Sequence, residues 1–284
     1  MQYTWLSAHI FYTGSAEEWL CGFIKPFVEK LEPQLHPLVP YFFIRYGEDG
    51  AHIRFRLQTP ATYFPAVKMM LEQDWYQQNV LMQNSYKLEF IPYLPEISRY
   101  GNESTIMLAE RQFFLSSGYC LDSMLSQSRW HTSAALAAAF QMHVAFFYAL
   151  DADIFTVQKI CEQFIEAWLG VLTLNMKNAS LASLLEHMNE LYGKQSASLN
   201  RNAQALWQSL EAGSAPANLQ KFALENRFVL NKYTKAGITD PQFYFAIRSL
   251  LHMTHNRLGI SNKEEPWCIY IIYRCLQYVY ENVC

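Results

Sequence analysis

A short strand-like segment carries cationic and imidazole side chains at alternating positions. Its sequence is Ala51-His52-Ile53-Arg54-Phe55-Arg56-Leu57. Side chains alternate across a β-strand, so His52, Arg54 and Arg56 share one face, while the apolar residues between them point to the core. Like charges side by side repel one another unless an anion or acidic groups neutralise them. The pattern therefore indicates either an anion-binding face or the exposed polar face of a half-buried sheet.

Further charged groups lie near predicted boundaries between elements. Arg45 precedes the turn before this strand, and its face depends on the strand register. The segment 92–101 holds Glu96 and Arg99 among two prolines and a glycine, where strand-like and helical sequence meet. Rigid junctions of this kind often carry binding sites, although a Glu–Arg pair can also simply fix a linker. We expect Glu110, on the helix that follows, to be a solvated carboxylate.

A third group of polar residues lies near the end of a predicted helix. His252, His255 and Asn256 are about one turn apart and can share a face. No carboxylate with metal-ligand spacing accompanies them, so we expect no metal site. The alternatives are an interior position for His252 and capping of the last carbonyls by Arg257, before Gly259.

The strands and helices that must position these residues fall into two parts of the chain with different sequence patterns. Strands and helices alternate as β-α-β-β-α-β, the ferredoxin-like pattern, over residues 3–12, 15–31, 41–46, 51–57, 59–75 and 86–93. After Gly101, helical periodicity continues almost to the C-terminus. The predicted class is α+β, with a sheet subdomain at 1–101 and a helical subdomain at 102–284, packed together as one domain.

Composition narrows the classes of function. Hydrophobic residues make up 51% of the 284 residues, and the formal net charge is −3. A large core is therefore available, and no basic excess attracts nucleic acid or an anionic membrane. We expect no signal peptide and no membrane span, because the apolar runs are short. Six scattered cysteines without a CxxC pair favour free thiols and a cytoplasmic location.

Together these segments resemble the C-terminal elimination domain of class I lantibiotic dehydratases, which is also found as stand-alone thiopeptide-type bacteriocin biosynthesis proteins. The resemblance spans essentially the whole chain and is carried by residues 5–12, 43–46, 52–56, 93–101, 109–114, 252–253 and 256–259. That family removes glutamate from a glutamylated Ser or Thr of a precursor peptide and leaves dehydroalanine or dehydrobutyrine.

The resemblance assigns roles to particular residues. It implies a catalytic set consisting of Arg54, Arg56, Glu96, Arg99 and His252. It adds substrate contacts from Arg45, His52, Tyr100, Asn256 and Arg257. It implies no cofactor, and its partners are a glutamylated precursor peptide and a separate glutamylation protein. Homodimer formation is left open.

Two other functions fit the same resemblance. Pyridine synthases of thiopeptide assembly share the fold and join two dehydroalanines into a ring. A non-catalytic module could instead bind the precursor peptide along a sheet edge. Under any of these functions, we expect aromatic side chains beside the charged groups to exclude water from a pocket, namely Phe43, Tyr46, Phe55, Tyr93 and Tyr100.

Overall fold

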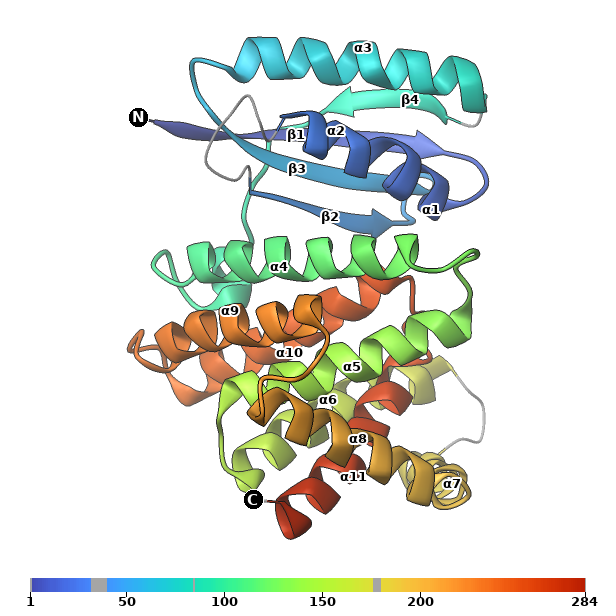
Figure 1. Cartoon of the computed structure of the whole chain (residues 1–284), viewed down its shortest axis with the longest axis vertical. Helices are drawn as coiled ribbons and strands as arrows, with labels where there is room; N and C mark the ends of the chain where they lie inside the picture. The colour runs from blue at the N-terminus through green and yellow to red at the C-terminus, as the bar shows by residue number, and fades with distance from the viewer. Residues whose placement is uncertain (1, 32–39, 84, 176–179, 284) are drawn as a thin grey trace. The chain divides into compact units, whose positions relative to one another are not determined.

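The computed structural model describes residues 2–31, 40–83, 85–175 and 180–283 and confirms the α+β class (Figure 1). Its contacts define two compact units. The sheet unit comprises Met1–Glu96 and Glu110–Trp130, and the helical unit comprises Ile97–Ala109 and His131–Cys284. The chain therefore passes between the units more than once, whereas we expected a single boundary after residue 101.

The sheet unit is built on a four-stranded antiparallel sheet. Its strands are β1 (Tyr3–Tyr12), β2 (Tyr41–Tyr46), β3 (His52–Pro60) and β4 (Ser85–Phe90). They lie in the order β2-β3-β1-β4. The fourth strand ends earlier than predicted, after the Ile91 amide donates to the Ser7 carbonyl at 3.2 Å. Pro92 follows and has no N–H to continue the ladder.

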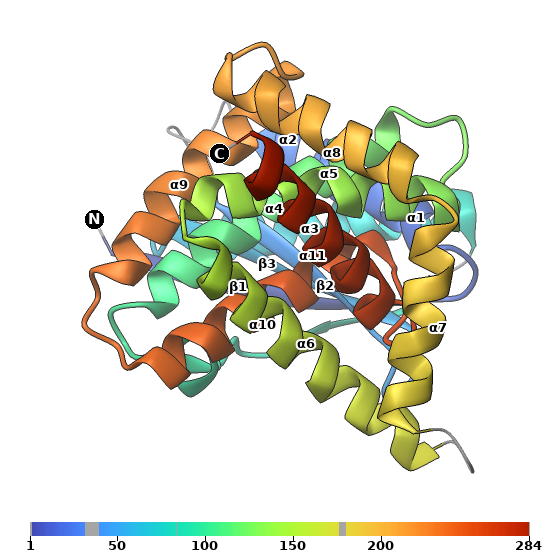
Figure 2. The same cartoon turned by 90° about the horizontal axis from the view of Figure 1, so that it is seen from below.

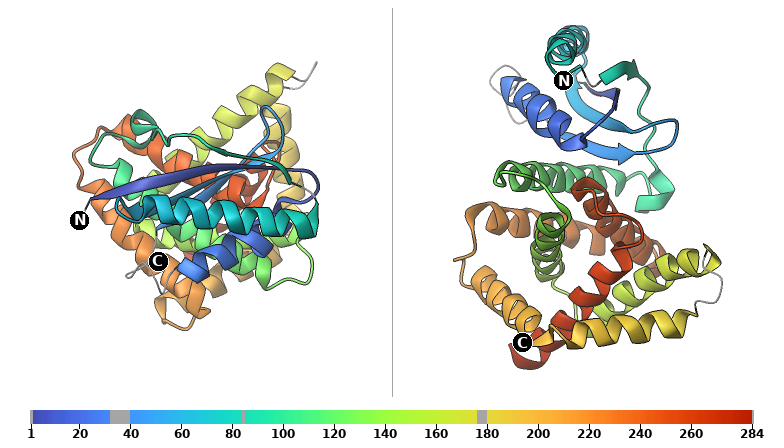
Figure 3. Two further views of the ribbon diagram at one scale, coloured as in Figure 1. Left: turned by 90° about the horizontal axis from the view of Figure 1, so that it is seen from above. Right: turned by 90° about the vertical axis from the view of Figure 1, so that its right-hand side faces the viewer.

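Two helical segments cover one face of the sheet (Figure 3). The first consists of α1 (Ala16–Trp19), a π-helical turn η1 (Leu20–Ile24) and α2 (Lys25–Leu31), and the second is α3 (Phe64–Met82). Ile53, Phe55 and Leu57 of β3 point into this layer and are completely buried. The alternation of β3 therefore places its apolar residues in the core, as predicted, and its His and Arg residues on the other face.

Helix α4 (Ile106–Leu125) covers the edge strand β2 within the sheet unit. The Phe43 amide donates to Ser117 Oγ at 3.3 Å, so α4 supplies an acceptor for a backbone group of this edge. The rings of Phe42 and Phe113 pack 5.2 Å apart. Because α4 contributes these contacts, most of it belongs to the sheet unit despite its place in the sequence.

The helical unit consists largely of antiparallel and crossing helices (Figure 2). They are η2 (Ile97–Tyr100), α5 (Thr132–Leu150), α6 (Ile154–Asn175), α7 (Leu181–Gly193), α8 (Ser196–Glu211), α9 (Ala217–Thr234), α10 (Asp240–Leu258) and α11 (Glu265–Asn282). Helix α5 packs against α8, α9, α10 and α11, and its alanine-rich sequence permits this close approach.

Helix α5 also has the length and hydropathy of a membrane-spanning helix, and among the described residues it alone has both. However, 61% of its apolar window is buried inside the structure. A buried helix of this composition is the ordinary core helix of a globular protein, so its hydropathy is weak support for a membrane span.

Candidate functional site

The strand register collects four polar side chains on the sheet face opposite α1–α3. Antiparallel pairing places His9 of β1 opposite Arg54, with Phe11 opposite His52 and Ser7 opposite Arg56. We call His9, His52, Arg54 and Arg56 the arginine face. His52 is 2% exposed and Arg56 is 6% exposed, so this is not the solvated polar surface that was one of the two interpretations.

Arg56 is a buried cation. Its Nη2 lies 3.2 Å from His9 Nε2, its Nη1 donates to the Phe55 carbonyl at 3.4 Å, and its Nε has no hydrogen-bond partner. Burial and then the charge of Arg54 lower the pKa of Arg56 from 12.5 to about 10, against the opposing effect of Tyr93. No ion pair joins Arg56 or Arg54 to a carboxylate among the described residues. A buried guanidinium in this condition is suited to an anionic ligand.

The two histidines of the arginine face act as hydrogen-bond acceptors. Burial and the charges of Arg56 and Arg54, with a contribution from His52, lower the pKa of His9 from 6.5 to about 3, so His9 is neutral. Its Nε2 can therefore accept from Arg56. Burial also lowers the pKa of His52, whose Nδ1 donates to the Gly50 carbonyl at 2.8 Å. This leaves His52 Nε2 to accept from Arg54 Nε at 3.2 Å.

Aromatic rings flank both arginines, which confirms part of the expected aromatic wall. The Arg54 guanidinium lies 3.3 Å from the centre of the Tyr46 ring, and that of Arg56 lies 5.6 Å from the Tyr93 ring. Phe43 and Phe55, in contrast, are fully buried on the opposite face of the sheet, because the register pairs them with each other there. Their predicted place in the pocket wall was wrong.

Glu110 takes part in the same region of the sheet unit, which the sequence did not predict. Tyr93 donates a hydrogen bond to the half-buried Glu110 carboxylate. Burial raises the pKa of Glu110, and the bond from Tyr93 only partly offsets this effect. The solvated carboxylate that we expected is therefore a partly desolvated one, which holds the ring beside Arg56.

Arg45 does not join the arginine face. Its Cα pairs with that of Ile53, so it points to the face that carries α1–α3. There its Nη1 forms an ion pair with Glu17 Oε1 at 2.6 Å. The sequence left the face of Arg45 open, and the register between the two strands directs it away from Arg54 and Arg56.

A second group of polar residues lines a cavity in the helical unit. The cavity has a volume of about 140 Å³, and we call it the histidine cavity; its walls are Arg99, Phe164, Ala167, Trp168, Phe245, Arg248, Ser249 and His252. Arg99 Nε donates to Ser249 Oγ at 3.3 Å. Arg248 donates to the carbonyls of Tyr244 and Gln163, at 3.3 and 3.0 Å, and burial lowers its pKa. Arg99 and His252 thus line one cavity, and a second guanidinium lies beside them.

His252 is held from behind by a buried carboxylate. Its Nδ1 lies 2.9 and 3.0 Å from the two oxygens of Glu265, and its ring packs 4.9 Å from that of Trp168. Glu265 is completely buried and also lies 3.1 Å from His255 Nδ1. His252 keeps 18% of its side chain exposed. It therefore combines access to the cavity with a fixed orientation, as proton transfer requires.

The remaining predicted site residues are not among those that form the arginine face or line the histidine cavity. Arg257 is fully buried and its Nη1 donates to the Met253 carbonyl at 3.1 Å, so its predicted contact with substrate was wrong. Its predicted capping role was wrong as well, because Met253 lies inside α10 and the backbone amides of Gly259 and Ile260 bond to the carbonyls at the helix end. Tyr100 is 4% exposed and belongs to the interior of the helical unit. Asn256 is half-buried near the end of α10, and Glu96 is exposed at the end of the first segment of the sheet unit.

The polar residues that the structure adds to the two candidate groups, and that the sequence did not reveal, are His9, His143, Arg248 and Glu265. His9 lies between Ser7 and Phe11 on one face of β1, but this position indicates a site only once the pairing with Arg54 and Arg56 on β3 is known. His143 is the one histidine in an alanine-rich helix and could have been noticed. Glu265 follows Glu264 in a polar turn, and nothing in its neighbourhood distinguishes it. Among the described residues, no group of three or more His, Cys, Asp or Glu side chains has an arrangement that could hold a metal ion.

Comparison with known proteins gives one family and several similar folds. The family model described as "Lantibiotic biosynthesis dehydratase C-term" matches residues 5–276. No curated protein sequence matches the chain. Among solved structures, TsrL has a TM-score of 0.70 at 14% identity, with 99% of this chain and 96% of TsrL covered.

Two further structures have the same fold. The pyridine synthase TbtD from thiomuracin biosynthesis has a TM-score of 0.71 at 13% identity, over 98% of this chain and 99% of TbtD. The tRNA-dependent lantibiotic dehydratase MibB from Microbispora sp. 107891 has a TM-score of 0.62 at 17% identity. This chain is covered to 99% in that match but corresponds to only 28% of MibB. At these identities the likeness concerns the fold alone.

Proposed function

Because the chain belongs to the lantibiotic dehydratase C-terminal family, we propose that it eliminates glutamate from glutamylated Ser or Thr residues of a precursor peptide. The product is dehydroalanine or dehydrobutyrine. The observation that carries this proposal is the arginine face, where two guanidinium groups lack a carboxylate partner among the described residues. A glutamyl group provides carboxylate oxygens that bind guanidinium in a bidentate manner.

The proposed reaction is a β-elimination with a simple balance of atoms. A base removes the proton on Cα of the esterified Ser or Thr, and the electron pair forms the Cα=Cβ double bond. The Cβ–O bond breaks, and glutamate leaves as a carboxylate with the two electrons of the broken Cβ–O bond. Negative charge develops on the peptide carbonyl beside Cα and on the departing oxygen, so cationic donors lower the barrier.

The side chains of the two units suit the separate tasks of this reaction. Arg54 and Arg56 bind glutamyl carboxylate oxygens, and neutral His9 and His52 hold these guanidiniums through acceptor nitrogens. His252 transfers the proton, because its cavity position and the Glu265 contact provide access and orientation. Arg99 and Arg248 place positive charge beside His252, where negative charge develops. Glu96 is assigned to substrate orientation and acid–base work.

A synthetic peptide with one glutamylated Ser tests the proposal directly. The wild-type protein should release free glutamate and leave a dehydroalanine peptide, both observed by mass spectrometry. Arg54→Lys and His252→Gln should each lower the rate at least about 10²-fold, because they remove bidentate recognition and proton transfer. Arg45→Lys, on the opposite face of the sheet, is the matched control and should retain the rate. Elimination at the wild-type rate by His252→Gln would contradict the assignment.

Pyridine synthesis is the second candidate, because the fold resembles that of TbtD along almost the whole chain. A peptide with two dehydroalanines distinguishes this function: ring formation from it, without glutamate release from the glutamylated peptide, would replace elimination. Binding of both peptides without turnover would indicate a precursor-binding module. We favour elimination because a synthase has no glutamyl carboxylate for the arginine face to bind.

The proposal also implies partners and a location. A glutamylation activity must supply the esterified peptide. A cytoplasmic location fits the buried thiols of Cys120, Cys161, Cys268 and Cys275. We further class the sheet unit as ferredoxin-like, on the basis of its strand order and alternating helices.

A further inference from the structure

Glu265 lies at the centre of a hydrogen-bonded group inside the helical unit. It begins α11 and is completely buried, and the two histidines that contact it come from α10, one turn apart. Its Oε2 lies 2.9 Å from His252 Nδ1 and 3.1 Å from His255 Nδ1. Its Oε1 lies 3.0 Å from His252 Nδ1. One carboxylate thus joins a cavity histidine to an interior histidine.

The chemistry of these contacts fixes the protons on both rings. Burial raises the pKa of Glu265, but the hydrogen bonds and charges of His252 and His255 outweigh burial, and its pKa lies below 4.5. An ionised carboxylate only accepts hydrogen bonds, so each Nδ1 that faces it carries a hydrogen. The second nitrogen of His252, Nε2, is then the atom that can exchange a proton with a ligand in the histidine cavity.

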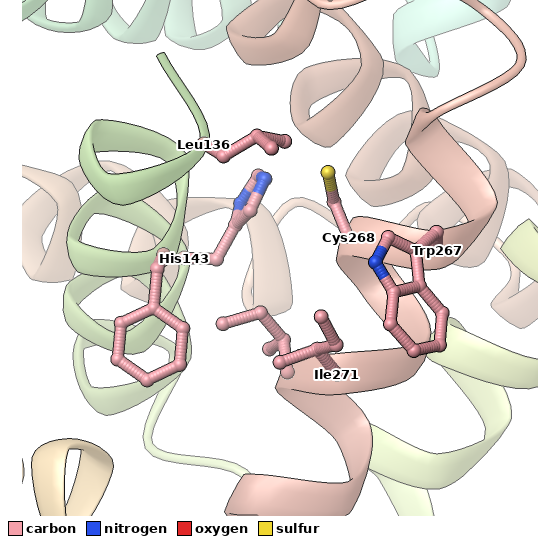
Figure 4. A pocket seen from close by; sticks show the side chains of 7 residues that line it. Leu136, His143, Trp267, Cys268 and Ile271 are labelled. Atoms are coloured by element: carbon pink, nitrogen blue, oxygen red, sulfur yellow. The ribbon is translucent and has the colours of Figure 1, made fainter. Parts of the chain in front are cut away.

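The group continues to a third imidazole. His255 Nε2 lies 2.8 Å from His143 Nε2 of α5, so one ring donates to the other. Burial and the neighbouring His255 hold the pKa of His143 well below 6.5, so His143 is neutral. Leu136, Trp267 and Ile271 surround the region of His143, beside a small apolar cavity of about 60 Å³ (Figure 4). His255 therefore has fixed partners at both nitrogens.

We infer that Glu265 is a positioning residue for His252: it holds the ring with Nδ1–H directed inward and leaves Nε2 as the proton-exchanging atom. His255, itself fixed by His143, holds Glu265 in place. This inference rests on the proposed function only in naming proton transfer as the task of His252. A carboxylate that orients a histidine in this way is a general device of acid–base catalysis, because one tautomer and one ring orientation are then maintained.

Two charged groups share the cavity with His252, and neither can take the place of Glu265. Arg99, of η2, and Arg248, of α10, line the same cavity, but both are donors. Neither can accept the Nδ1 hydrogen. Within the described part of the chain, the acceptor found at His252 Nδ1 is the Glu265 carboxylate.

Nitrogen-15 NMR of histidine-labelled protein tests the inference without any substrate. In the wild-type protein, His252 should give the shifts of the Nδ1–H tautomer at pH 8, with its signals assigned through the His252→Gln variant. Glu265→Gln should abolish this single tautomer, because a carboxamide presents a donor as well as an acceptor to the two rings. Glu264→Gln is the control: it makes the same change one residue earlier, where the carboxylate accepts from Ser261, and should leave the His252 signals unchanged.

The kinetic result follows from the same reasoning. With glutamylated peptide, Glu265→Gln should lower kcat at least about tenfold with little change in KM, because proton transfer is impaired and substrate binding is not. An Nε2–H tautomer in the wild-type protein would overturn the inference even if Glu265→Gln did not fold. An unchanged His252 tautomer in a folded Glu265→Gln variant would overturn it as well. Failure of the peptide to react would count against the proposed function and leave the NMR result standing.

Discussion

Replacement of Arg56 by methionine should stabilise the protein while it abolishes activity. The guanidinium is 6% exposed and has no carboxylate partner among the described residues. Its pKa in the folded state is about 10, against 12.5. This difference corresponds to a cost of about 3 kcal/mol for keeping the charge in the folded protein, at about 1.4 kcal/mol for each pH unit. Because the folded-state pKa is the lower one, the cost is fully present at neutral pH, where both states are protonated.

The variant removes the cost of burying this charge, but it also loses a favourable interaction. Arg56→Met removes the hydrogen-bond donor of the buried His9 Nε2, which costs about 1–2 kcal/mol. Methionine retains much of the volume of the arginine stem, so the packing term is small. The free energy of unfolding should therefore rise by about 1–2 kcal/mol, measured as a higher midpoint in urea with an unchanged slope.

Arg45→Met is the matched control with the opposite expected sign. It makes the same chemical change on the other face of the sheet, where it leaves the partly buried Glu17 without its ion-pair partner. We expect it to lower the free energy of unfolding by about 1–3 kcal/mol. If both variants were destabilised to the same extent, the interpretation of Arg56 as a cation held for a ligand would be refuted.

An added anion tests the same interpretation of Arg56 in a second way. Sodium glutamate at a hundred times its Kd should stabilise the wild-type protein by about 2.7 kcal/mol relative to sodium chloride of equal ionic strength. The increment should be much smaller in Arg56→Met. Equal increments in both proteins would show that glutamate acts elsewhere or non-specifically.

Two further predictions concern the arginine face and the junction before α4. His9 should not titrate between pH 8 and 5 in a histidine NMR titration, because its pKa is about 3. Its contribution to the free energy of unfolding should be lost as the pH falls from 6.5 towards 3, because the unfolded chain takes up the proton first. Titration of His9 near pH 6.5 would contradict this electrostatic account, and Arg56→Met should raise its pKa. Gly101→Ala should cost about 2 kcal/mol or more in urea unfolding, because φ is +107° and the new Cβ would lie 2.5 Å from Thr105 Oγ1. Gly14→Ala, at φ +87° with no atom within 4 Å, should cost only about 1 kcal/mol, and equal losses would show that the contact with Thr105 is unimportant.

Local periodicity determined much of the fold. Strands Tyr3–Tyr12 and Tyr41–Tyr46 and helix Ile106–Leu125 have the predicted bounds, because alternation and 3.6-residue spacing are properties of neighbouring residues. The common face of Arg54 and Arg56 was predictable for the same reason. The face of Arg45 was not, because it depends on pairing with a different strand.

Burial was harder to infer than periodicity. Glu110 and Arg257 are both charged residues on helices, and the sequence gives no sign that Tyr93 contacts the first or that the second is fully buried. Each position follows from contacts across the fold, where desolvation and available hydrogen bonds decide whether a charge can be accommodated.

The sequence by itself determined the family, the α+β class and the residue types suited to a carboxylate ligand, because these follow from local order and spacing. Only the tertiary structure decided which groups cooperate. It placed neutral His9 behind Arg56, and it joined His252 to Glu265, which follows it by 13 residues. Through Glu265 and His255 it also linked His252 to the distant imidazole of His143. Hydrogen bonds of this kind depend on distance in space rather than along the chain, and their strength depends on the burial that only the packed structure provides.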